Sequence, residues 1–513
     1  MSNIISKRIR SRQRRIEKRL DRFQFPADMS RPMMRGSNLH YELADRATGT
    51  AYGGIGLVHR LVQRLELARE IDSRVCVFKI HLPYFESDHV LNLVYNALCE
   101  GYCLEDLELR RQDEAYLNVL GADRVPDPTT AGDFCRRLGA HHLDALQEAF
   151  DAARRKVWAC QPDEFFEEAC LDADGILVPT NGECKEGMSL SYKGLWGYHP
   201  LVVSLRNTGE VLRLANRPGN RPSHEGAHVY FDQAIGVCRA AGFRRIRVCG
   251  DTDFSQTAYL DAWHDQGVLF TFGLKVSAPL WLRAEDLEKM AWKPLVRPPH
   301  YLPKGAPRGR RERVKQKVVE ERGFKDIRQV DEWVAEMNYR PAACRREYRL
   351  VLVRKNLIVS DPKQGRLFPD YRYFFYITND RDSTPAEVVF FANDRCNQEN
   401  VLAQLRAVRV LRVPLNTLLS NWAYMLITAQ AWNLKAWMAL SLPAPQGRWR
   451  ENQQVEKQRL LRMEFRTFVN IFVRIPCQIV KTGRKIVHRL LAWNRWQAVF
   501  FRLTGHLARP LRC

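Results

Sequence analysis

Apolar residues recur three and four positions apart through the first third of the chain. This spacing is typical of amphipathic helices. It is clearest in GLVHRLVQRLELAREI (56–71), DHVLNLVYNALCEG (88–101), EAYLNVLG (114–121), TAGDFCRRLG (130–139) and HHLDALQEAF (141–150), with short loops such as VPDPTT between them. Residues 1–155 are therefore predicted to form a helical N-terminal domain.

The apolar pattern changes from helical spacing to strands at about Phe165. Short apolar runs bounded by turn residues predict strands, and Asn207 to Gly209 predicts the turn of a hairpin. The expected elements are a strand in 167–180, a hairpin in 197–216, a helix over 224–241, a strand in 243–250, a short helix, and a strand in 267–276. Strands and helices that alternate in this order predict a mixed α/β sheet.

This alternation stops between about Ser277 and Tyr376. The segment holds the basic stretch PKGAPRGRRERVKQK (303–317) and the strand-like runs EYRLVLVRK (347–355) and YRYFFYITN (371–379), which predict a β-rich insertion with an exposed cationic loop. Helical spacing resumes at Thr384, and the basic, aromatic tail beyond Arg448 is predicted to be helical. The predicted segments after residue 155 are therefore 156–276, 277–380, 381–445 and 446–513.

The net charge of the chain indicates which class of molecule it binds. The 513 residues include 80 Lys and Arg and 58 Asp and Glu, which gives a formal net charge of +22. Such a field favours a polyanion, and we expect nucleic acid rather than an anionic membrane. Residues 7–22 could form a basic helix along phosphates, or a solvated charge run. The sequence contains no apolar run of about 18 residues, so no membrane span is predicted.

The N-terminus and the cysteines indicate the compartment. The first twenty residues are basic throughout and no apolar core follows them, so they do not form a secretory signal. Thirteen cysteines are scattered without a C-x-x-C pair, which favours reduced thiols over a disulfide framework or a zinc site. A cytoplasmic, nucleoid-associated protein is expected.

Acidic residues stand where two predicted strands end. Asp172 and Asp174 of LDADGILV share one face of a strand, because side chains alternate along it. Asp251 follows the strand RRIRVCG and should emerge at the carboxyl edge of the sheet, where α/β proteins usually bind ligands. The alternative for each is a turn-forming aspartate, and Asp253 could serve as the turn residue or as a substitute.

A third acid lies near a helix start. Glu399 of NDRCNQENVLAQLR (393–406) could be a surface residue that favours the positive end of the helix dipole. Together with the strand-end acids it suggests another role, because two Mg²⁺ ions in phosphoryl transfer need carboxylate oxygens that converge from separate elements.

Four stretches together resemble one protein family. They are LDADGILVPTNGE, SYKGLWGYHPLVVSLRNTGEVLRLANRPGN, VCGDTDF, and NDRCNQENVLAQLR with NWAYMLITAQAWNL behind it. In this order, over about residues 165–440, they resemble DDE transposases of bacterial insertion sequences, most closely the insertion sequence 1380 group of the insertion-sequence 4 superfamily.

The resemblance implies a fold and an activity. The fold is an RNase H-like catalytic domain with a β-rich insertion between the second and third acids. The activity is cut-and-paste transposition by metal-dependent strand cleavage and strand transfer. It implies two Mg²⁺ ions, with Mn²⁺ as an alternative. The implied partners are transposon ends, target DNA and a second copy of the chain in a synaptic complex.

The family motifs also select the catalytic residues. The first acid is usually followed by Gly, Ser or Thr, which selects Asp174 and leaves Asp172 in the second shell or facing solvent. The second acid matches Asp251, and the third, in Y-x(2)-R-x(3)-E-x(6)-K, matches Glu399. The resemblance thus implies that Asp174, Asp251 and Glu399 bind the metal.

Two positions of the third motif depart from the family pattern. Arg395 matches the motif, Ala392 replaces its Tyr, and Arg406 replaces its Lys. The first change removes an aromatic contact near the cleaved end. The change from Lys to Arg406 keeps a positive charge that can contact DNA. The planar Arg guanidinium presents its donors in a forked geometry, whereas the Lys ammonium is a point charge.

Two further segments could contact DNA. In SYKGLWGYHP, Lys193 could reach a phosphate. The aromatics are expected to be half-buried in a glycine-punctuated hairpin, and Tyr192 or Tyr198 stacked on a base is the alternative. In NRPGNRPSHEG, Arg217 and Arg221 could lie near DNA, or the loop could be only a connection. Three histidines, His199, His224 and His228, are expected to be structural or exposed, because hard cations prefer oxygen.

Two other functions compete with that of a transposase. One is a catalytically inactive relative that only binds DNA, which would have no need of an intact set of acids. The other is an RNase H-like nuclease that cleaves DNA without joining strands.

Overall fold

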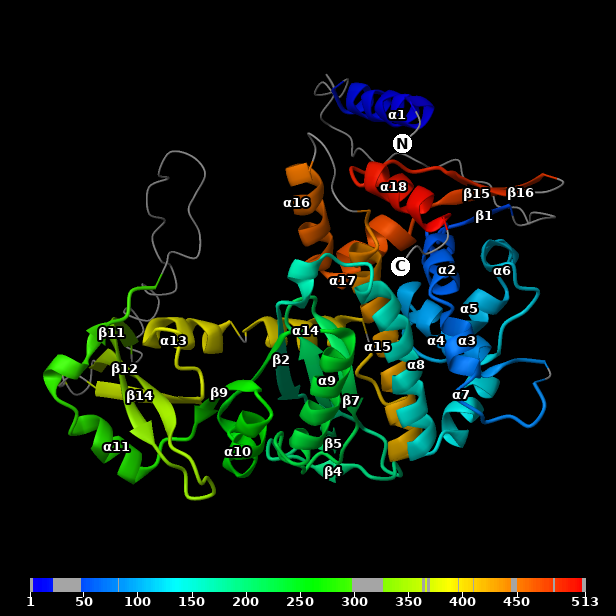
Figure 1. The fold of residues 1–513 in the computed structure, drawn as a ribbon. Helices are drawn as coiled ribbons and strands as arrows, with labels where there is room; N and C mark the ends of the chain where they lie inside the picture. The colour runs from blue at the N-terminus through cyan, green and yellow to red at the C-terminus, as the bar shows by residue number, and fades with distance from the viewer. Residues whose placement is uncertain are drawn as a thin grey trace. The chain divides into compact units, whose positions relative to one another are not determined.

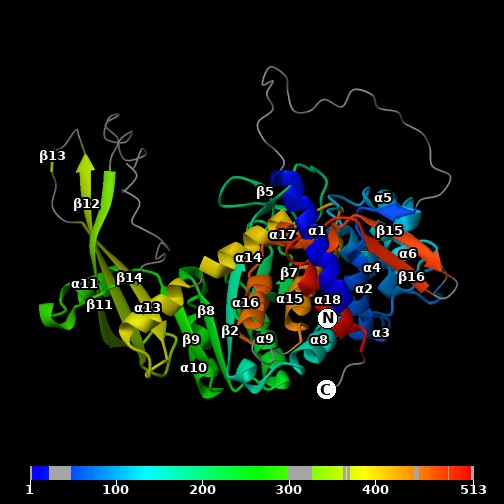
Figure 2. The ribbon, with the colours of Figure 1, turned by 90° about the horizontal axis from the view of Figure 1, so that it is seen from above.

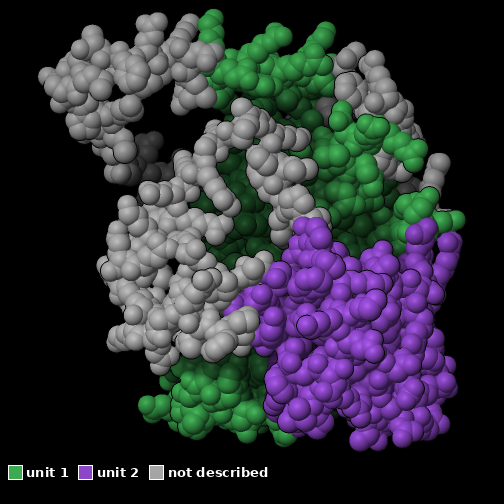
Figure 3. Space-filling model, turned by 90° about the vertical axis from the view of Figure 1, so that its left-hand side faces the viewer, with its two compact units in different colours: residues 1–165, 176–221, 400–513 green, residues 166–175, 222–399 purple. Residues whose placement is uncertain are grey.

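The computed structural model describes residues 3–21, 48–81, 83–297, 326–361, 365–366, 370–394, 396–408, 410–443, 450–482 and 485–509 (Figure 1). The chain divides into two compact units (Figure 3). Unit 1 comprises residues 1–165, 176–221 and 400–513, and unit 2 comprises residues 166–175 and 222–399. Both units are therefore built from segments that are distant in sequence. The domain boundaries at residues 155, 276, 380 and 445 stay predictions.

Helices form most of unit 1. They are α1 (Asn3–Asp21), α2 (Ile55–Arg64), α3 (Leu67–Asp72), α4 (Glu86–Leu98), α5 (Leu107–Arg111), α6 (Glu114–Leu120), α7 (Pro128–Arg137), α8 (Ala140–Trp158), α15 (Leu418–Leu440), α16 (Arg450–Leu461), α17 (Phe465–Phe468) and α18 (Gln497–Leu507). A π-helical turn (Val469–Val473) follows α17. The helices predicted between residues 56 and 153 are confirmed. The stretch 56–71 splits into α2 and α3 because Glu66 adopts a left-handed backbone with a φ of 54°.

Helix α15 is the central element of unit 1. It packs against α4, α8 and β7 (Glu210–Ala215), and Figure 1 shows it beside α8. Nearly every residue from Ser420 to Leu440 is buried, which explains why the helix is apolar on all sides. Among the described residues, no helix combines the length and apolar character that a membrane span needs.

Short strands complete unit 1. β6 (Leu201–Leu205) and β7 form the predicted hairpin, and every residue of the two strands is buried. β3 (Val178–Pro179), β5 (Trp196–Tyr198) and β4 (Ser189–Leu190) form one small sheet, and β1 (Gly49–Thr50), β15 (Cys477–Thr482) and β16 (Lys485–Leu490) form another. The tail was predicted to be helical. It is helical only in part, because β15 and β16 pair as a hairpin.

Unit 2 contains a mixed sheet with strand order β10-β11-β12-β14-β9-β8-β2. The strands are β2 (Glu168–Gly175), β8 (Arg245–Gly250), β9 (Leu269–Leu274), β10 (Lys293–Pro294), β11 (Asp326–Tyr339), β12 (Tyr348–Asp361) and β14 (Asp370–Thr378), and β13 (Gly365–Arg366) pairs with β12. β2, β8 and β9 are parallel, whereas β14, β12, β11 and β10 continue the sheet in antiparallel pairs. The predicted mixed α/β sheet is confirmed.

The β-rich segment extends this sheet. β14 pairs with β9, so the strands of the predicted insertion share hydrogen bonds with the preceding α/β part. Figure 2 shows β11 and β12 as a long antiparallel pair. The predicted cationic loop at 303–317 lies outside the described residues.

Helices and short 3-10 turns connect the strands of unit 2. They are α9 (Ala227–Ala241), α10 (Thr257–Asp265), α11 (Ala278–Glu285), α13 (Pro385–Asn393), η2 (Thr252–Phe254) and η3 (Lys289–Ala291). Two elements cross the unit boundaries, η1 (Asp163–Phe166) and α14 (Cys396–Ala407). The predicted order of strand, hairpin, helix, strand, helix, strand is confirmed.

A buried carboxylate joins three elements of unit 1. Glu210 of β7 is 0% exposed. It accepts hydrogen bonds from Arg154 Nε at 3.1 Å, Trp158 Nε1 at 3.0 Å, Trp437 Nε1 at 2.7 Å and Thr208 Oγ1 at 2.6 Å. Because a buried charge is tolerated only when it is paired and hydrogen-bonded, these donors fix β7 against α8 and α15.

We predict that Glu210→Gln lowers the free energy of unfolding of unit 1 by about 3–5 kcal/mol, because the substitution leaves the Arg154 cation without this buried partner. Urea unfolding followed by circular dichroism measures the change. Glu336→Gln is the matched control. Glu336 pairs with Arg349 at 2.6 Å but its side chain is 50% exposed, so about 1 kcal/mol or less is expected. Equal losses in the two variants would contradict the importance assigned to Glu210.

Candidate active site

Two parallel strands of unit 2 bring acidic residues to the same edge of its sheet. β2 and β8 pair from Glu168 beside Arg245 to Asp172 beside Cys249. The same offset, continued for two residues, puts Asp174 level with Asp251. Residues at the same level of neighbouring parallel strands point to the same face, on strands roughly 4.8 Å apart. The register therefore supports Asp174 and Asp251 as a pair at the carboxyl edge.

The burial of Asp172 distinguishes it from Asp174. Asp172 is 1% exposed, and Cys249 beside it is also buried. Asp174 is half-buried, and its Oδ1 accepts the backbone N–H of Gly175 at 2.8 Å. The solvent-facing alternative for Asp172 is therefore wrong. A supporting role beneath Asp174 stays a prediction.

Asp251 organises the turn after β8. Its Oδ1 accepts the backbone N–H of Asp253 at 2.9 Å and caps η2. Asp253 itself is exposed. Gly273 lies close to this turn, because a Cβ atom added there would be 2.9 Å from the Thr252 backbone nitrogen and 3.2 Å from the Asp251 carbonyl carbon. Glycine at this position lets β9 run close to the acidic turn.

A pocket of about 510 Å³ in unit 2 is lined by both Asp251 and Glu399. Glu399 lies in the first turn of α14 and is exposed. The other walls come from the end of β9 and the two residues after it (273–276), from residues 373–376 of β14, and from the end of α13. The structure thus brings the predicted second and third acids to one pocket, although they are 148 positions apart in the sequence.

Two residues of this pocket were missed by the sequence analysis. Lys275 is an exposed cation beside the acids. Tyr376 pairs with Gly273 across the sheet, and its hydroxyl donates to Asn393 Oδ1 at 3.4 Å. Burial raises the pKa of Tyr376, so its hydroxyl stays protonated. The alternation in YRYFFYITN puts Phe374 and Tyr376 on one face, but the pattern alone does not show which strand they would meet.

The donor set fits a hard divalent cation. Asp174, Asp251 and Glu399 offer carboxylate oxygens, and each is at least partly exposed. Within the described ranges, no group of three or more His, Cys, Asp or Glu side chains lies close enough together to hold a metal ion. The common metal site of the three acids therefore stays a prediction.

The hairpin that carries Lys193 projects aromatic side chains into solvent. Tyr192 is 82% exposed and Trp196 is 54% exposed, so the expected half-buried state of these aromatics is wrong. Lys193 Nζ lies 5.4 Å from the centre of the Tyr192 ring. An exposed cation and exposed rings in one short hairpin suit both a phosphate and a base.

Other predicted DNA contacts have structural partners. Arg217 Nε donates to the carbonyl of His199 at 3.1 Å, and Arg406 Nη2 donates to the carbonyl of Leu177 at 2.9 Å. Arg221 and Arg406 are exposed. Arg395 lies outside the described residues.

The remaining tyrosine and histidines of these segments serve the fold. The Tyr198 hydroxyl donates to the carbonyl of Glu186 at 2.7 Å. His199 Nδ1 lies 2.7 Å from the carbonyl oxygen of Arg221. His228 stacks on Tyr259 with ring centres 3.9 Å apart, and His224 is exposed. These contacts agree with the structural role expected for the histidines.

The family model of the transposase DDE domain group 1 matches residues 48–511 of the chain. The chain belongs to this family. The predicted family is thereby confirmed at the level of DDE transposases, which transfer phosphoryl groups on DNA. No curated protein matches the chain.

Among solved structures, the transposase is similar to a piggyBac transposase in a synaptic complex with hairpin DNA. The identity is 9% and the TM-score is 0.36, over 92% of this chain and 87% of that chain.

We predict that Asp174→Asn lowers the rate of DNA cleavage by roughly a thousandfold or more, because loss of the predicted metal ligand would remove several kcal/mol of transition-state stabilisation. Asp172→Asn should stay within tenfold of the wild-type rate. Nicking of labelled DNA in Mg²⁺ measures both, and circular dichroism checks that both variants are folded. Loss of cleavage in Asp172→Asn alone would assign the ligand role to Asp172.

Proposed function

We propose that the protein is a cut-and-paste DNA transposase of the insertion sequence 1380 group in the insertion-sequence 4 superfamily, with an RNase H-like catalytic domain. The observation that supports this is the position of its acids. The β2–β8 register, continued for two residues, supports Asp174 at the level of Asp251, and Asp251 and Glu399 line one pocket. Carboxylates that converge from elements distant in sequence suit the two-metal catalysis of phosphoryl transfer on DNA.

Asp174, Asp251 and Glu399 would hold two Mg²⁺ ions, or Mn²⁺ in their place. When bound, such ions activate the attacking oxygen and stabilise the leaving oxygen of an in-line displacement at phosphorus. Lys275 is placed in the same pocket to hold a non-bridging phosphate oxygen. Tyr376 and Phe374 form an apolar wall that would limit water around the phosphate. Water attacks in the cleavage step, and the 3′-OH that this step releases attacks target DNA in the transfer step.

DNA binding would rest on the basic surface. The net charge of +22 supports attraction to phosphates, and Lys193, Arg217, Arg395 and Arg406 are the proposed contacts with DNA. The partners would be the transposon ends and the target DNA. A homodimer would hold two ends together in the synaptic complex, in the cytoplasm at the nucleoid.

Two other functions give different experimental results. A catalytically inactive relative would bind DNA and never cut it. A nuclease of the same fold would cut DNA and never join an end to a target. Cleavage and strand transfer measured on one preparation therefore separate the three functions.

We predict that Glu399→Gln abolishes cleavage and leaves DNA binding intact. Glutamine keeps the size and helix propensity of glutamate but removes the charge that holds a divalent cation. The measurement is cleavage of DNA that contains the element end, in Mg²⁺ and again after chelation by EDTA, beside a binding assay. Chelation should abolish wild-type cleavage, and Mn²⁺ should restore it.

Glu451→Gln provides the matched control for this substitution. Glu451 is also an exposed glutamate in the first turn of a helix, α16, so it shares the dipole interaction of Glu399. It should cleave at the wild-type rate. If Glu399→Gln also cuts at that rate, Glu399 is only a surface residue and the three-acid mechanism is wrong.

We predict that the hairpin around Lys193 contacts DNA in two separable ways. Tyr192→Ala should weaken binding at every salt concentration by about 1–3 kcal/mol, because it removes a stacking surface. Lys193→Gln should reduce the slope of log K against log salt by about 0.7–0.9, the value for one phosphate contact. Fluorescence anisotropy with labelled DNA over a series of salt concentrations measures both.

Trp281→Ala serves as the control for the loss of an exposed ring. Trp281 of α11 is 43% exposed and lies outside the hairpin. Its removal should leave affinity and salt slope unchanged. Wild-type affinity and slope in both hairpin variants would show that the hairpin does not touch DNA.

A further inference from the structure

One arginine of unit 2 lies on the same face of the sheet as the predicted acids. Arg247 precedes Asp251 by four positions, on β8, and the backbone is still extended at Asp251. Because side chains alternate along an extended segment, both residues point to the same face. Arg247 also pairs with Cys170 of β2 in the parallel register that supports Asp174 beside Asp251. Arg247 therefore lies on the strand that leads to the candidate site.

The Arg247 side chain is shared by three other segments. Its Nη1 donates to Asp380 Oδ2 at 2.6 Å, and its Nη2 donates to Glu168 Oε1 of β2 at 3.3 Å. The side chains of Arg247 and Asp380 are 11% and 4% exposed. The guanidinium carbon lies 4.8 Å from the centre of the Phe391 ring of α13, within the range of a cation–π contact. Arg247 thus joins β2 and β8 to the turn before α13 and to the last turn of α13.

Asp380 organises the turn that begins α13. Its Oδ1 accepts the backbone N–H groups of Asp382 and Ser383 at 3.0 and 3.1 Å, and its Oδ2 accepts the Ser383 hydroxyl at 2.7 Å. Arg349 Nη1 of β12 donates to the carbonyls of Asp380 and Ser383 at 3.0 and 2.5 Å. Burial would raise the pKa of Asp380, but the hydrogen bonds from Arg247 and Ser383 hold this pKa well below its usual range. The carboxylate therefore stays charged and paired with Arg247.

Helix α13 connects this ion pair to the pocket of Asp251 and Glu399. Phe391 is followed by Ala392 and Asn393, and both of these residues line the pocket. Only residues 394 and 395 separate α13 from α14, whose first turn carries Glu399. Because the connection is so short, a displacement of α13 would also displace Glu399 relative to Asp251.

We propose that Arg247 is a positioning residue of the candidate active site. Its ion pair with Asp380 and its contact with Phe391 hold α13 against the sheet, and this sets the position of Glu399 relative to Asp251. In this role Arg247 acts through α13 and binds neither metal nor DNA. The inference rests on the proposed function for its chemical consequence, since Glu399 and Asp251 are proposed metal ligands.

The opposite face of the sheet offers a matched control. Val351 of β12 packs in one cluster with Val388 and Val389 of α13. Tyr348 of the same strand is three positions away and points to the other face, where its hydroxyl donates to Asp261 Oδ1 of α10 at 2.6 Å. Tyr348→Phe therefore removes a buried hydrogen bond of unit 2 on the face away from α13.

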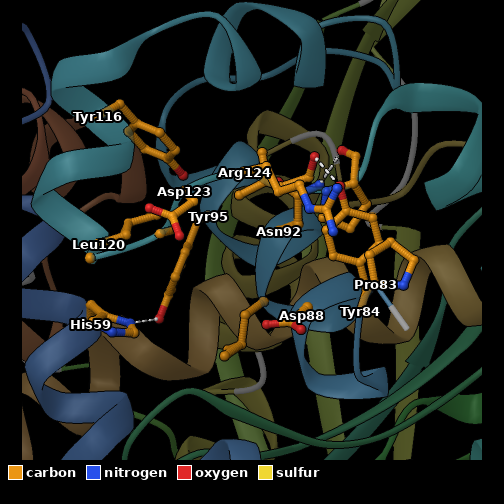
Figure 4. A pocket seen from close by; sticks show the side chains of 15 residues that line it. His59, Pro83, Tyr84, Asp88, Asn92, Tyr95, Tyr116, Leu120, Asp123 and Arg124 are labelled. Atoms are coloured by element: carbon orange, nitrogen blue, oxygen red, sulfur yellow. Dashed lines mark hydrogen bonds between the residues drawn. The ribbon is translucent and has the colours of Figure 1, made fainter. Parts of the chain in front are cut away.

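A hydrogen bond in unit 1 provides a second control. The Tyr95 hydroxyl of α4 lies 2.8 Å from His59 Nδ1 of α2. Figure 4 shows this contact on the wall of a pocket of about 390 Å³. Tyr95 is buried, so Tyr95→Phe also removes a buried hydrogen bond beside a pocket, but in the unit that contains none of the three predicted acids.

The first test is hydrogen exchange of the metal-free, full-length protein, measured by mass spectrometry on peptides that cover α13. Arg247→Gln and Asp380→Asn should each raise the exchange rates in α13 by about tenfold or more, because local opening becomes easier when the ion pair is lost. Arg247→Lys should give intermediate rates, since an ammonium keeps the charge but loses the forked contact with Asp380 and Glu168. Tyr348→Phe and Tyr95→Phe should leave these rates unchanged.

Phe391→Leu tests the same contact with less risk to folding. It keeps the ion pair and an apolar side chain but removes the ring that faces Arg247. The exchange rates in α13 should rise by about two- to fivefold, the effect of one cation–π contact. Circular dichroism checks that every variant is folded.

The second test measures binding of Mn²⁺ to the same proteins by electron paramagnetic resonance of the free ion. Arg247→Gln and Asp380→Asn should each weaken Mn²⁺ binding by about tenfold, because residues that orient metal ligands typically change affinity by about 10- to 100-fold. The double variant should bind like either single variant, since both changes remove one ion pair. A merely structural role would lower the melting temperature and leave Mn²⁺ affinity unchanged, as expected for the two controls.

Wild-type exchange rates in α13 of Arg247→Gln and Phe391→Leu would overturn the inference, and so would wild-type Mn²⁺ affinity in Arg247→Gln. Failure of the proposed function gives a different result. The wild-type protein would then bind no Mn²⁺ and cleave no DNA, whereas hydrogen exchange would still show whether Arg247 holds α13 in place.

Discussion

Unit 1 depends on the burial of one charge. Glu210 has no exposed surface, so water cannot satisfy its oxygens. Its carboxylate needs the guanidinium of Arg154 and the indole N–H groups of Trp158 and Trp437 at the same time. These donors belong to α8 and α15, so a shift of α8 along the β6–β7 hairpin would separate the Glu210–Arg154 ion pair, and a shift of α15 would break the hydrogen bond from Trp437. Apolar packing alone tolerates such sliding, whereas a directional network does not.

The periodicity of apolar residues predicted most helices and strands of the fold, but it did not predict which elements pair or pack with each other. Helical spacing revealed α4, α6, α7 and α8, and short apolar runs bounded by turn residues revealed β2, β8 and β9. The tail was misread because its basic and aromatic content resembles a helix, although apolar and polar residues alternate in CQIVKT and in KIVHRL. The pairing of β14 with β9 could not be foreseen, since a strand pattern does not specify its partner.

The residues of the candidate site could be predicted only where their position in a local sequence pattern indicated a role. Asp174 and Asp251 follow from strand ends and alternation, and the parallel register adds the support that a one-dimensional pattern lacks. Glu399 needed the family resemblance, because an acid in the first turn of a helix is ordinary by itself. Lys275 and Tyr376 were missed, since they meet the acids only through the order of strands in the sheet. The exposure of Tyr192 was misjudged because a glycine-rich hairpin can fold its rings inward or outward.

The division of the chain also determines how the protein can fold during synthesis. Unit 1 is assembled from three segments, and Glu210 and its partner Trp437 are 227 positions apart in the sequence. A ribosome makes residues 222–399, the larger segment of unit 2, between these two residues. At typical rates of about 5–20 residues per second, Glu210 waits for α15 for roughly 10–45 seconds. During that time the apolar surfaces that α15 covers remain open to aggregation. Chaperone supply and the rate of translation should therefore limit how much active protein a cell obtains from each messenger RNA.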